Sequence, residues 1–598
     1  MSATTKRRGP NPYAEMQALA AIFGFVFLVC VVIWAAAWIG TTDGDESPPG
    51  FPPALIVELV IGTYTWPGAG ATAAVVVLSV LVAAAVIGIV VAVALRKRRE
   101  VDVDRAVKYL AQPRDLRRAT TKGVAEIATR LDLDGIDPPG VLIGKTVRGE
   151  TKLWGSWEDM HVDIWGPRTG KTATRAIPNI VAAPGPAVVT SNKRDVVDAT
   201  RLSRMRRGRV WVFDPQAQAG EPASWYWDPL TYVGDSIVRA VKMTGRFSSI
   251  NRPDHARSDA YFEPAAEDLI ANMLLAASIE GLPITQVYTW LTRPTDDTPE
   301  RILRARGHDM SADAVDNVII SPDRQRAGVY GTAAQIMSFL IAPGVTEWVT
   351  PGSNPNRPQF DYLSFVKEGA DTLYLLSEET NKMAAPLVLA LTAALAEAAE
   401  NFGIASPGGR VDVPILFVLD EAANVCPWKA LPDKYSHFGS RGIVMMTILQ
   451  SWAQGAAAWG DTGMAKLWGA ANVRVYGGGV LDTKFLGDLS SSSGIFEPEV
   501  KSTSHKVHDL WEKNVTNSSR SEPVLDVPDL ASMPRGRAFV QYSGMKPALV
   551  RTIPWWEGPY ADEIRASLAR FEPGGTGGPL GPLDVDPTDP PVRLDKVA

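Results

Sequence analysis

The chain contains little cysteine and has no excess of positive charge. Its 598 residues include two cysteines, Cys30 and Cys426, and Cys30 lies in an apolar run. These counts exclude a disulfide framework and a cysteine-rich zinc site. Because 60 Lys and Arg oppose 66 Asp and Glu, the formal net charge is −6. The overall charge therefore gives no indication of a nucleic-acid partner, although a local basic patch could still bind one.

The composition is that of a folded protein with several domains. Hydrophobic residues make up 46% of the chain and charged residues 21%, which excludes a disordered or collagen-like chain. At roughly 150 residues per domain, the length allows about three or four domains. Residues 572–598 are rich in Pro, Gly and Asp, and we expect this tail to be disordered.

Two long uncharged apolar stretches near the N-terminus predict a two-helix transmembrane hairpin. The first extends from Gln17 to Thr42 and the second from Leu59 to Leu95. Each contains more than the ~20 apolar residues that an α-helix needs to cross a bilayer. The expected segments are a cytoplasmic tail at 1–16, transmembrane helices at 17–40 and 71–95, and an extracytoplasmic loop at 41–70.

The charges that flank these stretches predict their orientation. Basic residues 6–8 precede the first span and 96–99 follow the second, whereas the loop at 41–70 has no Lys or Arg. The positive-inside rule then puts both termini in the cytoplasm, in a two-pass protein of the inner (cytoplasmic) membrane. The alternative is a signal peptide cleaved near residues 35–37, but its apolar core would be unusually long and the second span would remain.

The residues after the second span alternate between strand-like and helical patterns, which predicts an α/β fold with a parallel sheet. From 234 to 350 the apolar residues recur at helical spacing, and we expect an inserted all-α domain there. The α/β domain is therefore expected at 96–233 and 351–560. The apolar runs expected to be strands include GVLIGKTV, HVDIW, PAVVTSNK, GRVWVFDP, DTLYLLS, VPILFVLDEA, GIVMMTILQS, NVRVYGGG and RGRAFVQYSG.

A glycine-containing loop between a strand and a helix predicts a phosphate-binding loop. Backbone N–H groups of such a loop surround a phosphate at the helix N-terminus. Lys171 is expected to reach the β- and γ-phosphates of ATP, and the Thr172 hydroxyl to bind Mg²⁺. The usual pattern has glycine where this chain has Trp165. The expected nucleotide-binding residues are Gly166, Pro167, Arg168, Thr169, Gly170, Lys171, Thr172 and Ala173.

A second motif, PILFVLDEA, places two carboxylates directly after an apolar strand. Ligands of parallel sheets bind at the carboxyl ends of the strands. We expect Asp420 to hold Mg²⁺ and Glu421 to act as the general base that polarises the attacking water. The alternative for this pair is a solvated acidic turn, but both motifs occur in one chain and in the expected order.

Two further polar residues are catalytic candidates. Gln450 ends the strand GIVMMTILQ, where it could sense the γ-phosphate. Arg441 precedes the same strand and could act in trans as an arginine finger. The alternative for Arg441 is an ordinary solvated loop arginine.

Taken together, these motifs resemble the TraG-like family of type IV secretion coupling proteins. The resemblance covers roughly residues 1–560 and rests on the two apolar spans, GPRTGKT with IPNI, VVTSNKRDVV, FVLDEAANV, SRGIVMMTILQSWAQ and RGRAFVQYSGMKPALV. Lys171, Thr172, Asp420, Glu421 and Gln450 stand at matching positions, and Arg441 matches less securely. The chain departs from the family at Trp165 and at 191–193, where many members carry an aspartate.

The resemblance implies a RecA-like P-loop NTPase motor that uses ATP and Mg²⁺ and works as a membrane-anchored homohexamer. Such motors deliver relaxase–DNA complexes or secreted proteins to the channel components of a type IV secretion system. The expected contacts therefore include membrane lipid and, without sequence specificity, single-stranded DNA. The alternatives are a nucleotide-binding recruitment platform with little turnover, and a translocase of the segregation or specialised-secretion type.

The sequence does not separate DNA from protein as cargo. Arginines at 201–209 form a basic cluster that could attract phosphates, but we favour the alternative that they form a solvated helix face. His505 and His508 have a metal-like spacing but no companion ligands.

Overall fold

The computed structural model describes residues 14–41, 52–80, 82–84, 102–250, 261–367, 369–496, 499–506, 509–519 and 521–575. The chain divides into two compact units, Met1–Asp102 and Val103–Ala598, and each is described by itself. Most of the tail expected to be disordered (576–598), the end of the second predicted span (85–95) and His508 lie outside the described residues.

The second unit is built on a single sheet of eleven strands in the order β2-β1-β15-β14-β9-β3-β8-β7-β4-β6-β5. The strands from β9 to β5 are parallel, and the remaining four pair antiparallel at one end. The parallel strands are β3 (His161–Ile164), β4 (Ala187–Ser191), β5 (Val210–Phe213), β6 (Thr372–Leu376), β7 (Ile415–Leu419), β8 (Ile443–Leu449) and β9 (Val473–Tyr476). The antiparallel strands are β1 (Gly140–Thr146), β2 (Lys152–Ser156), β14 (Arg537–Tyr542) and β15 (Ala548–Arg551). The predicted α/β class with a parallel sheet is confirmed.

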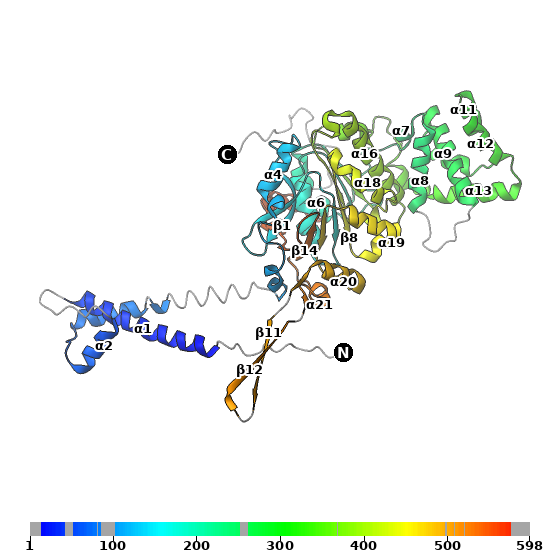
Figure 1. Cartoon of the computed structure of the whole chain (residues 1–598). Helices are drawn as coiled ribbons and strands as arrows, with labels where there is room; N and C mark the ends of the chain where they lie inside the picture. Colours follow the sequence, from blue (N-terminus) through cyan, green and yellow to red (C-terminus); the bar gives the residue numbers. More distant parts are fainter. Residues whose placement is uncertain are drawn as a thin grey trace. The chain divides into compact units, whose positions relative to one another are not determined.

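The central strands are continuously apolar because helices cover both faces of the sheet. In β7, Ile415, Phe417 and Leu419 belong to one core, whereas Leu416 and Val418 point into the other. Figure 1 shows the sheet between two helical layers. Helices α16 (Ala385–Ala405), α18 (Leu431–Phe438) and α19 (Trp452–Ala470) contribute to the first core, and α4 (Thr121–Arg130), α5 (Ile177–Ala182) and α6 (Asp195–Met205) to the second.

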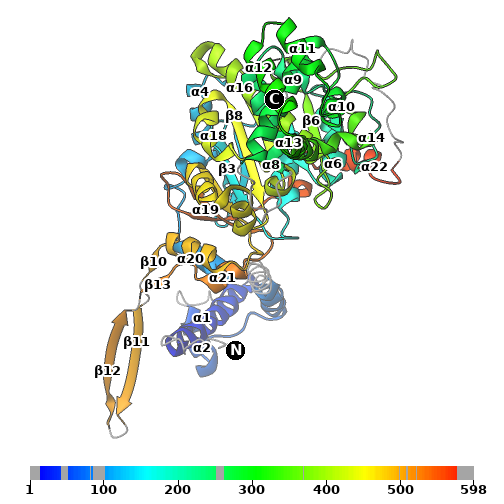
Figure 2. The same ribbon diagram turned by 90° about the vertical axis from the view of Figure 1, so that its right-hand side faces the viewer.

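Among the described residues between β5 and β6, the regular elements are helices, apart from one isolated bridge between Tyr226 and Gln359. Their apolar faces join the core that lies on the α16 side of the sheet, and Figures 1 and 2 show them grouped together. These helices are α7 (Leu230–Val233), α8 (Ile237–Ile250), α9 (Phe262–Glu280), α10 (Thr285–Leu291), α11 (Thr298–Ala305), α12 (Asp309–Ile319), α13 (Asp323–Ile336), α14 (Pro343–Thr346) and α15 (Tyr362–Lys367).

Smaller elements follow β7 and β9. Two short strands, β10 (Ile495–Phe496) and β13 (Glu522–Pro523), pair with each other, and β11 (Glu499–Lys506) pairs with β12 (Asp509–Ser519). The sequence analysis does not predict this second hairpin. The remaining helices are α17 (Ala422–Val425), α20 (Thr483–Ser492), α21 (Val527–Ala531) and α22 (Ala561–Phe571).

An ionic cluster fastens the inserted helices to α16. Glu397 of α16 accepts hydrogen bonds from Lys242 (2.5 Å), Arg246 (2.8 Å) and the Tyr232 hydroxyl (2.6 Å). The guanidinium of Arg246 also lies 4.4 Å from the centre of the Tyr232 ring. Because α7 and α8 supply these partners, one carboxylate orients the start of the insertion.

The predicted arginine cluster at 201–209 is largely structural. Arg204 is fully buried and donates to Thr372 and to the carbonyls of Ala183, Gly185 and Ala370. It therefore joins the connections that precede β4 and β6, and it cannot contact DNA. Arg201 pairs with Glu221 at 2.5 Å. The expectation of a basic surface that includes Arg204 is thus wrong.

In the first unit, α1 (Ala14–Gly40) covers the first predicted span. A short helix, α2 (Pro52–Ile61), lies within the predicted loop, where the sequence analysis does not expect it. A third apolar helix, Ala69–Ala84, lies at the start of the second predicted span. A Cβ on Gly40 would lie 2.5 Å from the Cβ of Ala71, so the end of α1 closely approaches the start of the helix Ala69–Ala84.

By length and hydropathy alone, α16 also qualifies as a candidate membrane-spanning helix. Within the described residues it is the one helix long and apolar enough to cross a membrane, but 72% of that stretch is buried inside the protein. It is a core helix that is apolar all round because it packs against the sheet and the insertion. The predicted hairpin of two spans stays a prediction.

The Glu397 cluster predicts a pH-dependent stability. Burial by itself raises the pKa of Glu397, but hydrogen bonds from Lys242 and Tyr232 and the charge of Arg246 outweigh burial and lower it. The contribution is therefore fully present above the unfolded pKa of about 4.3 and is lost as the pH falls through the lower folded pKa. We expect Glu397→Gln to destabilise the protein by about 2 kcal/mol at pH 7, and by less near pH 4.

Denaturant unfolding of both proteins at the two pH values measures this difference. Glu126→Gln is the matched control, because Glu126 is half exposed and lies 3.9 Å from Arg117, and such a pair contributes about 0–1 kcal/mol. An equal loss of stability at both pH values would contradict the assignment.

Candidate nucleotide site

The loop from Gly166 to Lys171 connects β3 to the helix that begins at Thr172. Gly166 donates its N–H to the Gly478 carbonyl at 2.9 Å, and a Cβ at Gly166 would lie 2.0 Å from the Gly479 carbonyl oxygen. Gly170 has φ +98°, which strongly favours glycine. Pro167 and Arg168 are exposed, and the Thr169 hydroxyl closes the loop on the Gly166 carbonyl at 2.5 Å.

Trp165 is a core residue and does not belong to the loop. Its side chain is buried, and its backbone N–H continues the sheet to Leu449. A Cβ at Gly477 would lie 1.9 Å from the Trp165 ring, so the indole fills the space beside that glycine. The departure from the usual pattern is therefore a tightly packed indole beneath a loop that starts one residue later.

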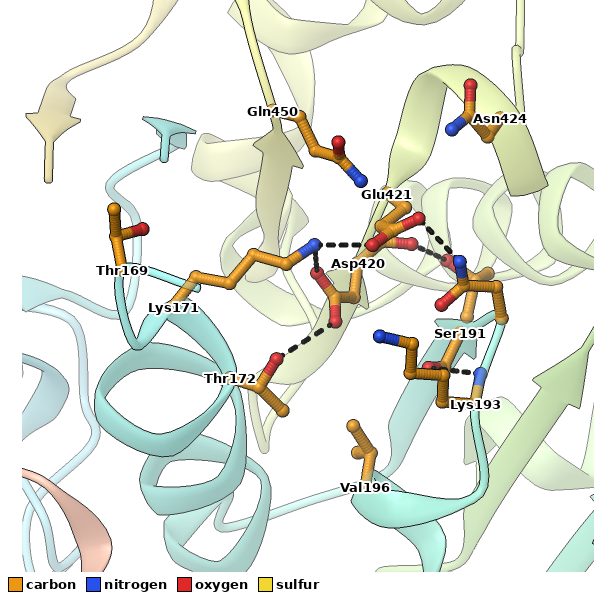
Figure 3. A network of polar contacts seen from close by, with 12 residues as sticks. Thr169, Lys171, Thr172, Ser191, Lys193, Val196, Asp420, Glu421, Asn424 and Gln450 are labelled. Atoms are coloured by element: carbon orange, nitrogen blue, oxygen red, sulfur yellow. Dashed lines mark hydrogen bonds and ion pairs between the residues drawn. The ribbon is translucent and has the colours of Figure 1, made fainter. Parts of the chain in front are cut away.

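Lys171 lies between the two predicted carboxylates, as Figure 3 shows. Its Nζ is 2.9 Å from Asp420 Oδ1 and 2.9 Å from Glu421 Oε1. Burial alone would lower the pKa of Lys171, but the two carboxylates outweigh burial and raise it. Burial raises the pKa of Asp420 more than Lys171 lowers it. The two sequence motifs, 248 to 250 residues apart, therefore form one charged cluster.

The donor set fits Mg²⁺ next to a nucleotide. The Thr172 hydroxyl lies 3.5 Å from Asp420 Oδ2. Asp420 Oδ1 is buried and, among the described residues, accepts no aligned hydrogen bond, although Lys171 pairs with it electrostatically. A carboxylate with spare lone pairs beside a hydroxyl is an oxygen-rich set of the kind that Mg²⁺ prefers.

Glu421 has a strained backbone. Its φ of 55° and ψ of 44° lie in the left-handed region, which non-glycine residues seldom adopt. Its side chain is 5% exposed. Strain of this kind persists where surrounding contacts fix it and is common at functional sites.

Asn192 and Glu379 join the cluster, although the sequence analysis did not assign them. Asn192 Nδ2 donates to Glu421 Oε2 at 2.6 Å and lies 3.4 Å from Glu379 Oε2. Asn424 donates to the other oxygen of Glu379 at 2.5 Å. Asn192 follows β4 and Glu379 follows β6, so the parallel order of the strands is the signal that could have indicated them.

Gln450 and Arg441 lie at opposite ends of β8. Gln450 follows the carboxyl end, and its side chain points toward Lys171 and Glu421 in Figure 3. Arg441 precedes the amino end and donates to the Gly409 carbonyl at 2.9 Å. Within this chain Arg441 is therefore at the edge of the sheet away from Lys171.

A buried ion pair fixes the phosphate-loop helix to the sheet. Arg175 in that helix is fully buried and donates to Asp163 of β3 at 2.6 Å and to the Leu142 carbonyl of β1. Its guanidinium also lies 3.2 Å from His161 Nδ1. Burial, and then the charge of Arg175, lower the pKa of His161 well below its usual value. His161 and Asp163 are polar residues within the buried strand β3, and this pattern could have indicated a buried polar partner such as Arg175.

The comparisons with known proteins agree with this arrangement. Residues 414–535 match the family described as "TraM recognition site of TraD and TraG". The bacterial conjugative coupling protein TrwB in its unbound form has the same fold, with a TM-score of 0.51 and 16% identity over 69% of this chain and 88% of that chain. TrwB in complex with ADP and Mg²⁺ gives 0.50 and 15%, over 69% and 90%. No curated protein matches the chain in sequence.

The Arg175–Asp163 pair predicts a specific pattern of stability. Arg175→Met leaves Asp163 as an unpaired buried charge, so we expect a loss of about 3–5 kcal/mol. Adding Asp163→Leu removes that charge and should recover most of the loss. Arg206→Ala is the control, because Arg206 is 60% exposed and should cost less than about 0.5 kcal/mol. Denaturant unfolding measures all four proteins, and a double variant no more stable than Arg175→Met would contradict the ion-pair account.

Proposed function

We propose, on the premise that the chain is a TraG-like type IV coupling protein, that it is a P-loop ATPase that drives conjugative transfer. Its cargo would be a relaxase–DNA complex or a secreted protein, delivered to a type IV secretion channel. The observation that carries the proposal is the cluster in which Lys171 contacts Asp420 and Glu421 at the carboxyl edge of the parallel sheet.

Each side chain of the cluster has a chemical role in this proposal. Lys171 would hold the β- and γ-phosphates together with the N–H groups of the loop, and Thr172 and Asp420 would hold Mg²⁺. The bound Mg²⁺ supplies positive charge against the phosphates. Glu421 would accept a proton from the attacking water, and Gln450 lies where it could sense the γ-phosphate.

The matched segment supports a partner from the DNA-processing complex. Residues 414–535 contain α17 to α21 and both small hairpins, and the family they match is described by its recognition of TraM. TrwB, whose fold the chain shares, is a conjugative coupling protein and binds ADP and Mg²⁺. We extend these properties to this chain, together with the homohexamer and the single-stranded DNA contact.

The N-terminal unit would anchor the motor. Uncharged apolar helices flanked by basic residues favour a two-pass hairpin in the inner membrane with both termini in the cytoplasm. Residues 96–99 would then also meet anionic lipid.

A second candidate is a recruitment platform that binds nucleotide with little turnover. The observation in its favour is that Lys171 is neutralised by two carboxylates of its own chain. A nucleotide must displace these contacts before Lys171 can bind phosphate. A turnover measurement separates the two functions.

We expect the full-length chain, purified in detergent or reconstituted in lipid, to hydrolyse ATP in the presence of Mg²⁺. Lys171→Ala should abolish nucleotide binding, whereas Glu421→Gln should keep binding and lower turnover by about 10²–10⁴-fold. Lys367→Ala, which removes an exposed lysine outside the cluster, serves as the control. Nucleotide binding without turnover in the wild-type chain would favour the recruitment platform.

The cargo can be tested in the same assay. Single-stranded DNA should raise turnover at low salt, and the effect should shrink as salt increases, because phosphate contacts release counterions. Turnover that DNA leaves unchanged at both salt concentrations would favour protein cargo.

Membrane topology is tested with two single-cysteine variants in a background that lacks Cys30 and Cys426. A membrane-impermeant maleimide added to intact spheroplasts should label Ser47→Cys, in the predicted outer loop, and leave Ser2→Cys unlabelled. Labelling of both positions, or of Ser2→Cys alone, would contradict the proposed hairpin.

A further inference from the structure

Asn192 is a polar group shared by two carboxylates. Its Nδ2 lies 2.6 Å from Glu421 Oε2 and 3.4 Å from Glu379 Oε2. The first distance is that of a strong charge-assisted hydrogen bond and the second is at the limit of any hydrogen bond. In this structure the amide therefore belongs to Glu421, with Glu379 as the second acceptor within reach.

Glu421 has both carboxylate oxygens engaged. Oε1 accepts from Lys171 Nζ at 2.9 Å, and Oε2 accepts from Asn192. The side chain is almost fully buried, and its backbone is held in the left-handed region. A general base must turn a lone pair toward the water it deprotonates. The two hydrogen bonds restrain the carboxylate from doing so.

The two restraints respond differently to a nucleotide. Phosphates attract Lys171 and so withdraw the donor from Oε1. Asn192 is uncharged and follows a different strand, so the phosphates do not compete for it in the same way. We propose that Asn192 is a positioning residue that restrains Glu421 in the loaded site until its amide transfers to Glu379. This inference rests on the proposed ATPase function.

Glu379 is suited to receive the amide. It is exposed, in the connection that follows β6, and its other oxygen is held by Asn424 at 2.5 Å. Asn424 lies in α17, the helix that directly follows Glu421. A partner that contacts the exposed connection could thus shift Glu379 toward Asn192, which would link an external contact to the freedom of the base.

The first test compares Asn192→Ala with Glu379→Gln in the full-length chain, without DNA. Asn192→Ala removes the restraint, so kcat should rise about tenfold with KM for ATP unchanged, as expected for the loss of one charge-assisted hydrogen bond. Glu379→Gln weakens the second acceptor, so kcat should stay at or below the wild-type value. A kcat that rises in Asn192→Ala but not in Glu379→Gln distinguishes a restraint on Glu421 from general damage to the hydrogen bonds that these residues share.

Several outcomes would overturn the inference. An Asn192→Ala kcat that falls would mean that the amide orients Glu421 productively, and an unchanged kcat would mean that it has no effect. A rise in both variants would indicate loosening of the whole cluster. If the wild type turns over and Asn192→Ala is no faster, the inference alone fails. If neither turns over while both bind nucleotide, the ATPase proposal fails with it.

A second test needs no turnover. In the nucleotide-free chain, the melting temperatures of Asn192→Ala, Glu421→Ala and the double variant form a double-mutant cycle. Because both single changes remove the same hydrogen bond, the combined shift in melting temperature should be smaller than the sum of the two. Additive shifts would show that the two side chains are not coupled, and the proposed restraint would be wrong.

Discussion

The parallel order of the central strands is the constraint on which the site depends. Parallel strands bring their carboxyl ends to one edge, and the polar residues of the cluster lie in the connections that follow five of these strands. Lys171 follows β3, Asn192 follows β4, Glu379 follows β6, Asp420 and Glu421 follow β7, and Gln450 follows β8. Segments that are up to 279 residues apart (450 − 171) therefore meet because the apolar runs before them pair in a fixed order.

Burial then determines which charged side chains need a compensating partner. Removing a charge from water is tolerated when a partner compensates it, and the buried charges near the site are paired in this way. Arg175 meets Asp163 beneath the loop helix, and Lys171 meets two carboxylates above it. The first pair is closed on all sides and has a structural role. The second has one basic group for two acids, and Asn192 donates a further hydrogen bond to one of those acids, Glu421.

Much of the fold could be predicted from the sequence because it depends on local pattern. Apolar runs of four to seven residues identified β1, β3 to β9 and β14, since a strand buried on both faces is apolar throughout. Asp420 and Glu421 were predicted because they directly follow such a run, and Lys171 and Thr172 because they end a glycine-containing loop between a strand and a helix. Arg441 precedes β8, so strand direction puts it at the other edge of the sheet, and its predicted role in another subunit's site stays a prediction.

The parts that could not be predicted depend on contacts between distant residues. No local pattern pairs Asn192 with Glu421 and Glu379, which are 229 and 187 residues away from it. Arg204 looked like one member of a basic surface because its neighbours are basic, and only the packing of α6 beneath the β4 and β6 connections shows that it is buried. The α2 helix was missed because a segment with several prolines favours a loop in any local analysis.

The amide at position 192 changes the electrostatics of the site compared with a carboxylate. An aspartate at position 192 could only accept hydrogen bonds and would repel both Glu421 and Glu379. Asparagine donates to whichever of the two is nearer, so this chain has a neutral donor between two acids. A neutral donor leaves the charge balance around Lys171 unchanged while it fixes the direction of Glu421. At position 192 the chain thus has a hydrogen-bond donor to Glu421, where an aspartate would add another negative charge beside Lys171 and its two carboxylates.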